Sequence, residues 1–118
     1  MMNIEVNGNN IKVKLYNNSS ADALKELLKK GPLTISMKDY AHMEKFGSLG
    51  MQLPANDEHI TTKAGDVILS EGNLLVIYYA PNTWNFTRLG KVCSLSEAEL
   101  RKVLGKGSIT ATLTIDEE

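Results

Sequence analysis

The segment APNTWNFTRLGKV, residues 80–92, carries the side chains of this chain that are best suited to binding chemistry. Arginine stays charged and offers five hydrogen-bond donors in a planar fork, while Trp84 and Phe86 offer apolar surface beside Arg88. In an extended strand Phe86, Arg88 and Gly90 share one face, opposite the side chains between them.

A purely structural role for the same residues is the alternative. In that case Arg88 pairs with a surface carboxylate, and Trp84 and Phe86 pack beneath residues 39–64, since aromatic side chains usually belong to a core. The only other arginine, Arg101, lies in a predicted helix and has the pattern of a solvated surface residue.

Residues 39–64 show no sustained hydrophobic period. A connection of this length in a compact domain is often functional, or it contains short strands that a pattern does not reveal. Its mixture of aromatic and charged residues is typical of a groove wall, so we expect it to face the segment 80–92. The predicted ligand-binding residues are Tyr40, Glu44, Phe46, Trp84, Phe86 and Arg88, and the predicted catalytic residue is Arg88.

Other site chemistry finds little support. His42 and His59 are the only histidines, 17 positions apart, and no further histidine or cysteine completes a zinc-type ligand set. Cys93 is the single cysteine and excludes an internal disulfide. The sequence GKGS at 105–108 follows a helix and precedes a strand, the reverse of a phosphate-binding loop. We therefore predict neither a metal nor a cofactor.

Composition indicates one ordinary globular domain, residues 1–118. The chain is 42% hydrophobic and 23% charged with a formal net charge of −1, and its basic residues alternate with acidic ones, so no nucleic-acid partner is expected. No run approaches the roughly 20 apolar residues of a membrane span, and no signal segment opens the chain. We expect a cytoplasmic protein without a membrane partner, present as a monomer or weak homodimer.

Hydrophobic alternation and turn residues predict mostly antiparallel strands. Two capped helices interrupt them, one beginning at Ser19 and ending at Gly31, the other opened by the Ser96–Glu99 capping box. The predicted fold is mainly β: a closed, mostly antiparallel barrel whose ends are covered by helices near 20–30 and 96–104. The predicted strands lie at 4–6, 11–15, 33–37, 65–70, 74–79, 80–92 and 108–115.

With this order of elements, AGDVILSEGNLLVIYYAPNTWNFTRLGKV is similar to a run found in the cyclophilins. There a strand led by glycine and an aliphatic or aromatic strand precede a tryptophan loop and a strand ending in Phe-Gly-Lys-Val, matched here by Leu89 to Val92. The chain most resembles the small bacterial cyclophilin-like proteins. The resemblance implies a cyclophilin-like β-barrel with peptidyl-prolyl isomerase activity. In that activity Arg88 would be the donor that lowers the barrier of about 18–20 kcal/mol to rotation about the amide bond.

Departures from that family concern its catalytic residues. The Phe-His-Arg and Phe-Met-x-Gln-Gly-Gly-Asp segments of cyclophilins are replaced by AHMEKFGSLGMQLPANDEH, which contains no arginine. The family's histidine on the closing strand aligns with Phe86. We therefore expect a barrel that binds a peptide or small organic ligand in an outer groove. The alternatives are a weak prolyl isomerase acting through Arg88 and a non-catalytic interaction domain that self-associates through an edge strand.

Overall fold

The computed structural model describes residues 1–116, which form nine strands and two helices. In chain order these are β1 (Met2–Val6), β2 (Asn9–Leu15), α1 (Ser19–Lys29), β3 (Leu33–Tyr40), β4 (Glu44–Ser48), β5 (Glu58–Thr61), β6 (Asp66–Ser70), β7 (Leu74–Tyr78), β8 (Thr83–Val92), α2 (Glu97–Leu104) and β9 (Ile109–Ile115).

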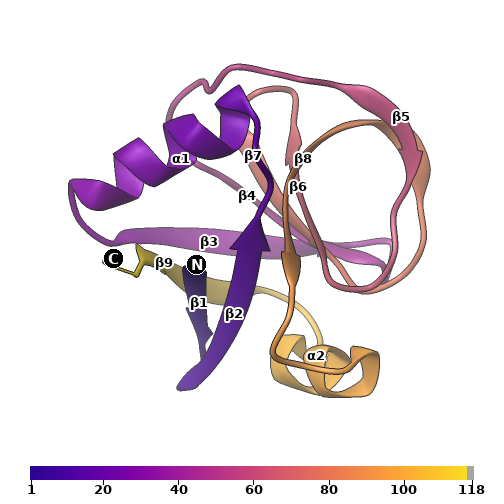
Figure 1. The fold of residues 1–118 in the computed structure, drawn as a ribbon. Coiled ribbons are helices and arrows are strands. Elements are labelled where there is room, and N and C mark those ends of the chain that lie inside the picture. Colours follow the sequence, from indigo (N-terminus) through magenta and orange to yellow (C-terminus); the bar gives the residue numbers. More distant parts are fainter. Residues whose placement is uncertain (117–118) are drawn as a thin grey trace.

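Eight of these strands close into an antiparallel barrel. The order of neighbours is β2-β1-β9-β3-β4-β7-β6-β8, and β8 pairs back onto β2. The first and last strands lie side by side, with Met2 opposite Ile115. β5 pairs only with β8 and lies outside the barrel wall, while α1 crosses one end of the barrel and α2 the other (Figure 1). The predicted fold class is confirmed.

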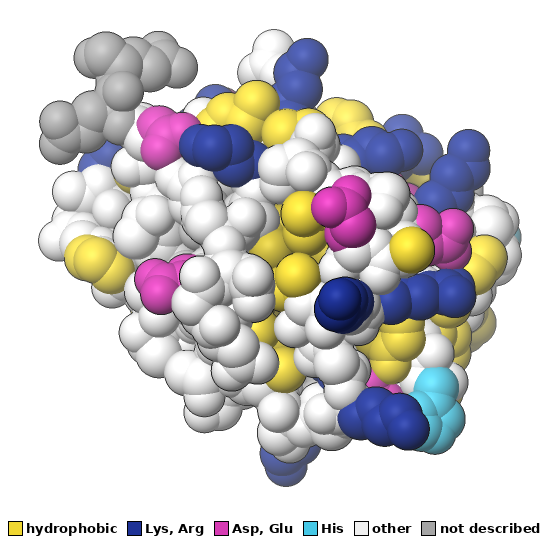
Figure 2. Space-filling view, turned by 90° about the horizontal axis from the view of Figure 1, so that it is seen from below, with side chains coloured by type: hydrophobic (Ala, Val, Ile, Leu, Met, Phe, Trp, Pro, Cys, Tyr) yellow, Lys and Arg dark blue, Asp and Glu magenta, His cyan; other side chains and the backbone are white. Residues whose placement is uncertain are grey.

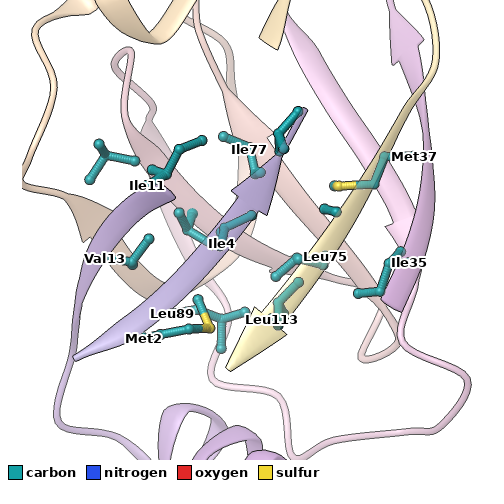
Figure 3. Close-up of a cluster of buried hydrophobic side chains, with 14 of the residues drawn as sticks. Met2, Ile4, Ile11, Val13, Ile35, Met37, Leu75, Ile77, Leu89 and Leu113 are labelled. Carbon is teal, nitrogen blue, oxygen red and sulfur yellow. The ribbon is translucent and has the colours of Figure 1, made fainter. Parts of the chain in front are cut away.

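Alternating side chains fill the interior of the barrel. Figure 3 shows inward-pointing residues from strands far apart in sequence meeting in one cluster. Leu24 and Leu28 of α1 and Leu100 and Leu104 of α2 join the same cluster, so each helix buries one apolar face against an open end of the barrel. Both helices are therefore held mainly by this burial.

The helix ends follow the expected chemistry with one correction. In α2 the side chain of Ser96 accepts from the backbone N–H of Glu99, and the Glu99 side chain reaches back, as the capping box predicts. In α1 the cap is Asn18 instead of the predicted Ser19, because the Asn18 side chain accepts from the N–H of Ala21 at 2.8 Å. Asparagine is at least as good an N-cap as serine.

The predicted connection 39–64 contains two strands, β4 and β5. β4 reads EKFGS and has no alternation of its own; it is held by pairing on both sides, with β3 and β7. Its Gly47 permits this, since a Cβ there would lie 2.5 Å from the carbonyl oxygen of Ser36. β5 has only four residues. Both strands depend on tertiary neighbours, so local pattern could not reveal them.

The barrel closes through a short and crowded contact between β2 and β8. Only three residue pairs join the two strands, from Val13 opposite Val92 to Leu15 opposite Gly90. A Cβ at Gly90 would lie 2.6 Å from Cγ1 of Val13 and 2.7 Å from the carbonyl oxygen of Lys14. Glycine is therefore required at this position by the close approach of the strands.

A β-bulge in β8 changes which side chains face outward. β6 pairs Val67 with Gly90 and Ile68 with Arg88, which leaves Leu89 without a partner on β6. Leu89 points into the barrel, and Arg88 points outward beside Ile68. The prediction that Gly90 shares the outward face is wrong, because the extra residue shifts the alternation and turns Gly90 inward opposite Val67.

Gly90→Ala should lower the free energy of unfolding by about 1–3 kcal/mol, because overpacking of a tight strand contact displaces its neighbours. Chemical denaturation measures this loss. Lys91→Ala serves as the control, since Lys91 is exposed on the same strand and should change stability by about 0.5 kcal/mol or less. Equal effects of the two substitutions would contradict the proposed role of Gly90 in closure.

Candidate functional site

A second apolar cluster lies on the outer face of the barrel. β8 pairs with β6 through its C-terminal half and with β5 through its N-terminal half, so β5 extends the sheet over the outside of the wall. The side chains beneath it form a small core, separate from the interior. Its buried members are Ile60, Ile68, Val76, Tyr78 and Phe86, with Phe46 and Leu74 partly buried against them. This cluster gives one outer face a packed core of its own.

Three of the predicted ligand-binding residues meet at an open hollow on this face. Tyr40, Glu44 and Phe46 line one side, and the hairpin from Ser70 to Val76 lines the other. The hollow measures about 410 Å³. The Tyr40 and Phe46 rings meet edge to face with centroids 6.4 Å apart, and Tyr40 is 56% exposed. The structure thus brings these three together at an accessible surface.

Glu44 is the unusual side chain of the hollow, because it is a carboxylate with only 9% of its surface exposed. The hydroxyl of Tyr78 donates to its Oε1 at 3.5 Å, and that hydroxyl accepts from Nδ2 of Asn82 at 3.2 Å. Burial raises the pKa of Glu44, repulsion from Asp39 adds to this, and the Tyr78 hydrogen bond opposes it. Burial also raises the pKa of Tyr78 to about 12.

Phe86 differs from the prediction that it contacts a ligand. It lies on the outer face as expected, but it is only 4% exposed, and its ring packs 5.5 Å from that of Tyr78. The cause is β5, whose Ile60 closes over the cluster. Phe86 therefore belongs to the packed outer cluster and is almost fully shielded from solvent.

Trp84 and Arg88 lie outside the hollow. Trp84 is opposite Ile60 in the β5–β8 pair and is 64% exposed. The Arg88 guanidinium lies 3.9 Å from a Glu58 carboxylate oxygen and 6.0 Å from the centroid of the Tyr16 ring. This exposed pairing with a surface carboxylate matches the structural alternative considered for Arg88.

Four residues that line the hollow were absent from the predicted set: Ser70, Glu71, Leu74 and Val76. Tyr78, whose hydroxyl donates to Glu44 beside the hollow, was absent as well. Tyr78 is the next-to-last residue of the run LLVIYY, whose composition is that of a core strand. That the Tyr78 side chain points outward can be inferred only when residues 44–48 are known to pair with β7. In that pairing Glu44 lies opposite Tyr78. Glu71 lay in a predicted hairpin turn, where a charged residue carries no particular signal.

A buried polar network lies beside the hollow, on the inner side of β3 and β4. Lys45 has 0% exposure, and its Nζ donates to Asp39 Oδ1 at 3.1 Å and to the carbonyl oxygen of Gly107 at 2.6 Å. The Tyr79 hydroxyl also donates to Asp39. Because Lys45 is inaccessible, the network acts as a structural link between the β3–β4 hairpin and the segment before β9.

Asp39→Ala should cost about 3–5 kcal/mol of stability, because it leaves the buried Lys45 charge without its partner. Desolvation alone would raise the pKa of Asp39, but bonds from Tyr79 and Lys45 outweigh it and hold the pKa below 3.8. The stabilisation is therefore present above that value and disappears as the pH falls through the lowered folded pKa. Denaturation from acid to neutral pH measures both effects.

Glu58→Ala is the matched control, since it removes an exposed carboxylate whose ion pair should contribute about 1 kcal/mol or less. A loss for Asp39→Ala as small as that of the control, or one that does not shrink in acid, would show that the network contributes little.

Glu44→Gln should stabilise the protein near neutral pH. The folded pKa of Glu44 lies above its ordinary value of 4.5, so the ionised form opposes folding once the pH rises past that value. An uncharged amide removes this opposition and can still accept from Tyr78. The gain should be largest near neutral pH and should vanish below about pH 4, where both side chains are neutral. Denaturant midpoints across this range measure it, and a destabilised Glu44→Gln protein at neutral pH would contradict the expectation.

The surface at the end of the barrel that carries α2 differs from the outer face that holds the hollow. Figure 2 shows charged side chains of both signs around a narrow strip of hydrophobic ones on this side.

Among residues 1–116, no three His, Cys, Asp or Glu side chains gather as a metal site would require. No helix in the described part of the chain is long and apolar enough to cross a membrane.

A family model described as the Cyclophilin-like family matches residues 4–116. The match covers every strand and helix of the barrel except the first two residues of β1. No curated protein and no solved structure matches the chain.

Proposed function

The chain belongs to the cyclophilin-like family, and we propose that it binds a peptide or small organic ligand on the outer face of its barrel. The observation that supports this most directly is the hollow beside Tyr40 and Phe46. Its volume of about 410 Å³ falls within the range of small-ligand sites, and aromatic, aliphatic and carboxylate groups meet there.

The packing of the lining residues favours binding. Phe46, Leu74 and Val76 of the hollow belong to the outer cluster, so the hollow is largely preformed and a ligand need not order it. Trp84 extends the same face as an exposed aromatic ring. From β4 through β7 and β6 to β8 the face spans three strand spacings, about 14 Å, which an extended peptide of about four residues covers.

Binding is favoured over prolyl isomerisation because the only outward guanidinium of this wall does not reach the hollow. Arg88 points toward Glu58 and Tyr16, and the hollow is lined by other residues. Catalysis would require a donor held against the bound amide. Without such a donor in the hollow, the face is suited to recognition.

Amide NMR shift mapping tests the proposal with pentapeptides Ac-Ala-Ala-X-Ala-Ala-NH2, in which X covers apolar, aromatic, acidic and basic side chains. At least one peptide should shift the amides around Tyr40, Phe46 and Trp84. Tyr40→Ser should weaken that peptide about fivefold or more, because it removes the exposed ring of the hollow. Tyr16→Ser, which removes an exposed ring outside the hollow, is the control.

Two results would overturn the proposed function. One is the absence of saturable shifts with every peptide; the other is a shift map that avoids the outer face and is unchanged by Tyr40→Ser.

A further inference from the structure

We infer that the outer-face hollow selects a positively charged alkyl group, the side chain of an arginine or lysine in the bound peptide. This inference rests on the proposed function of the same face and specifies the chemistry that it recognises.

The first observation is the pair of carboxylates that line the hollow, Glu44 and Glu71. Within residues 1–116 the structure gives neither of them an ion pair with Lys, Arg or His. Glu44 is nine-tenths buried, and its one side-chain hydrogen bond is the long 3.5 Å contact from Tyr78. A buried carboxylate with so little compensation is costly for the protein alone, and a cation from outside would offset that cost.

The second observation is the arrangement of the aromatic rings. Tyr40 and Phe46 meet at an interplanar angle of 80°, so the two rings present both an edge and a face at the side of the hollow. A guanidinium or ammonium placed over such a face is attracted by the ring quadrupole. Carboxylate and aromatic ring together favour a cation over a neutral polar group of the same shape.

The third observation concerns the stem of such a side chain. Leu74 and Val76 line the opposite side of the hollow, next to the partly buried Phe46. Arginine and lysine bury their methylene groups along apolar surface and keep the charged end among polar partners. The hollow offers both parts, with Glu44 at the end near Tyr78 and Glu71 in the turn at the other end of β7.

Two lysines lie near these carboxylates, one on β3 and one on β4. Lys38 lies opposite Phe46 on the neighbouring strand and is exposed at the edge of the face. Lys45 points to the inner side and is neutralised by Asp39. Two carboxylates thus face one exposed ammonium at the edge, and the local charge is negative.

The decisive comparison uses the peptide Ac-Ala-Ala-Arg-Ala-Ala-NH2 and the same peptide with citrulline in place of arginine. Citrulline has nearly the same shape as arginine but carries no charge. The arginine peptide should bind the wild-type protein at least about fivefold more tightly, as measured by amide shift titration. Its dissociation constant should rise between about 0.02 and 0.5 M NaCl, whereas that of the citrulline peptide should change little.

Variants assign the effect to the hollow. Glu44→Gln should remove most of the preference for arginine over citrulline while the protein stays folded, since this change is expected to stabilise it. Glu5→Gln is the matched control on β1, across the barrel from β7, and should leave the preference unchanged. Lys38→Gln should strengthen arginine binding, because it removes the cation at the edge.

The outcomes separate the two proposals. Equal binding of both peptides, with shifts around Tyr40 and Phe46, would overturn the charge selection and leave the proposed function standing. A preference for arginine that survives Glu44→Gln unchanged would also overturn it. If no peptide of any kind shifts this face, the proposed function itself fails.

Discussion

Closure of the barrel depends on a single close approach, that of β2 to β8 at Gly90. Three residue pairs complete a wall of eight strands, and no side chain larger than hydrogen fits at the third of them. The bulge at Leu89 belongs to the same constraint, because it sends Leu89 into the interior while Arg88 stays outside. The capped ends, the filled interior and the outer face all presuppose this closure.

The structure of the outer face depends on the two pairings of β8, one with β6 and one with β5. Beyond the bulge β8 belongs to the barrel wall, and before it the strand leaves β6 and pairs with β5. That departure covers Phe86 and Tyr78 and leaves the surface between β4 and β7 open. One strand thus supplies part of the wall, the Phe86 ring of the outer cluster and the exposed ring of Trp84. The acidity of the hollow comes from β4 and from the turn between β6 and β7.

Sequence reasoning was strongest where the signal was local. The Ser96–Glu99 box, the turn at Glu71–Gly72 and the alternation of β9 predicted their elements, and with the resemblance to cyclophilins they predicted the barrel. β4 and β5 were missed because their stability comes from neighbours distant in sequence.

The same limit applied to the candidate site. Tyr40, Glu44 and Phe46 were predicted from composition and do line one hollow, whereas the burial of Phe86 depends on β5, which no local pattern indicated.

The pairing of β1 with β9 constrains the order in which this chain can fold. Met2 and Ile115 are neighbours in the wall although almost the whole chain separates them, so a long loop must close before this contact contributes any free energy. On the ribosome, the hairpins of β1–β2 and β6–β7 can form as they emerge, but the wall stays open until β9 has been made. A nascent chain therefore exposes unpaired strand edges until β9 is available, and the barrel gains its cooperative stability only then.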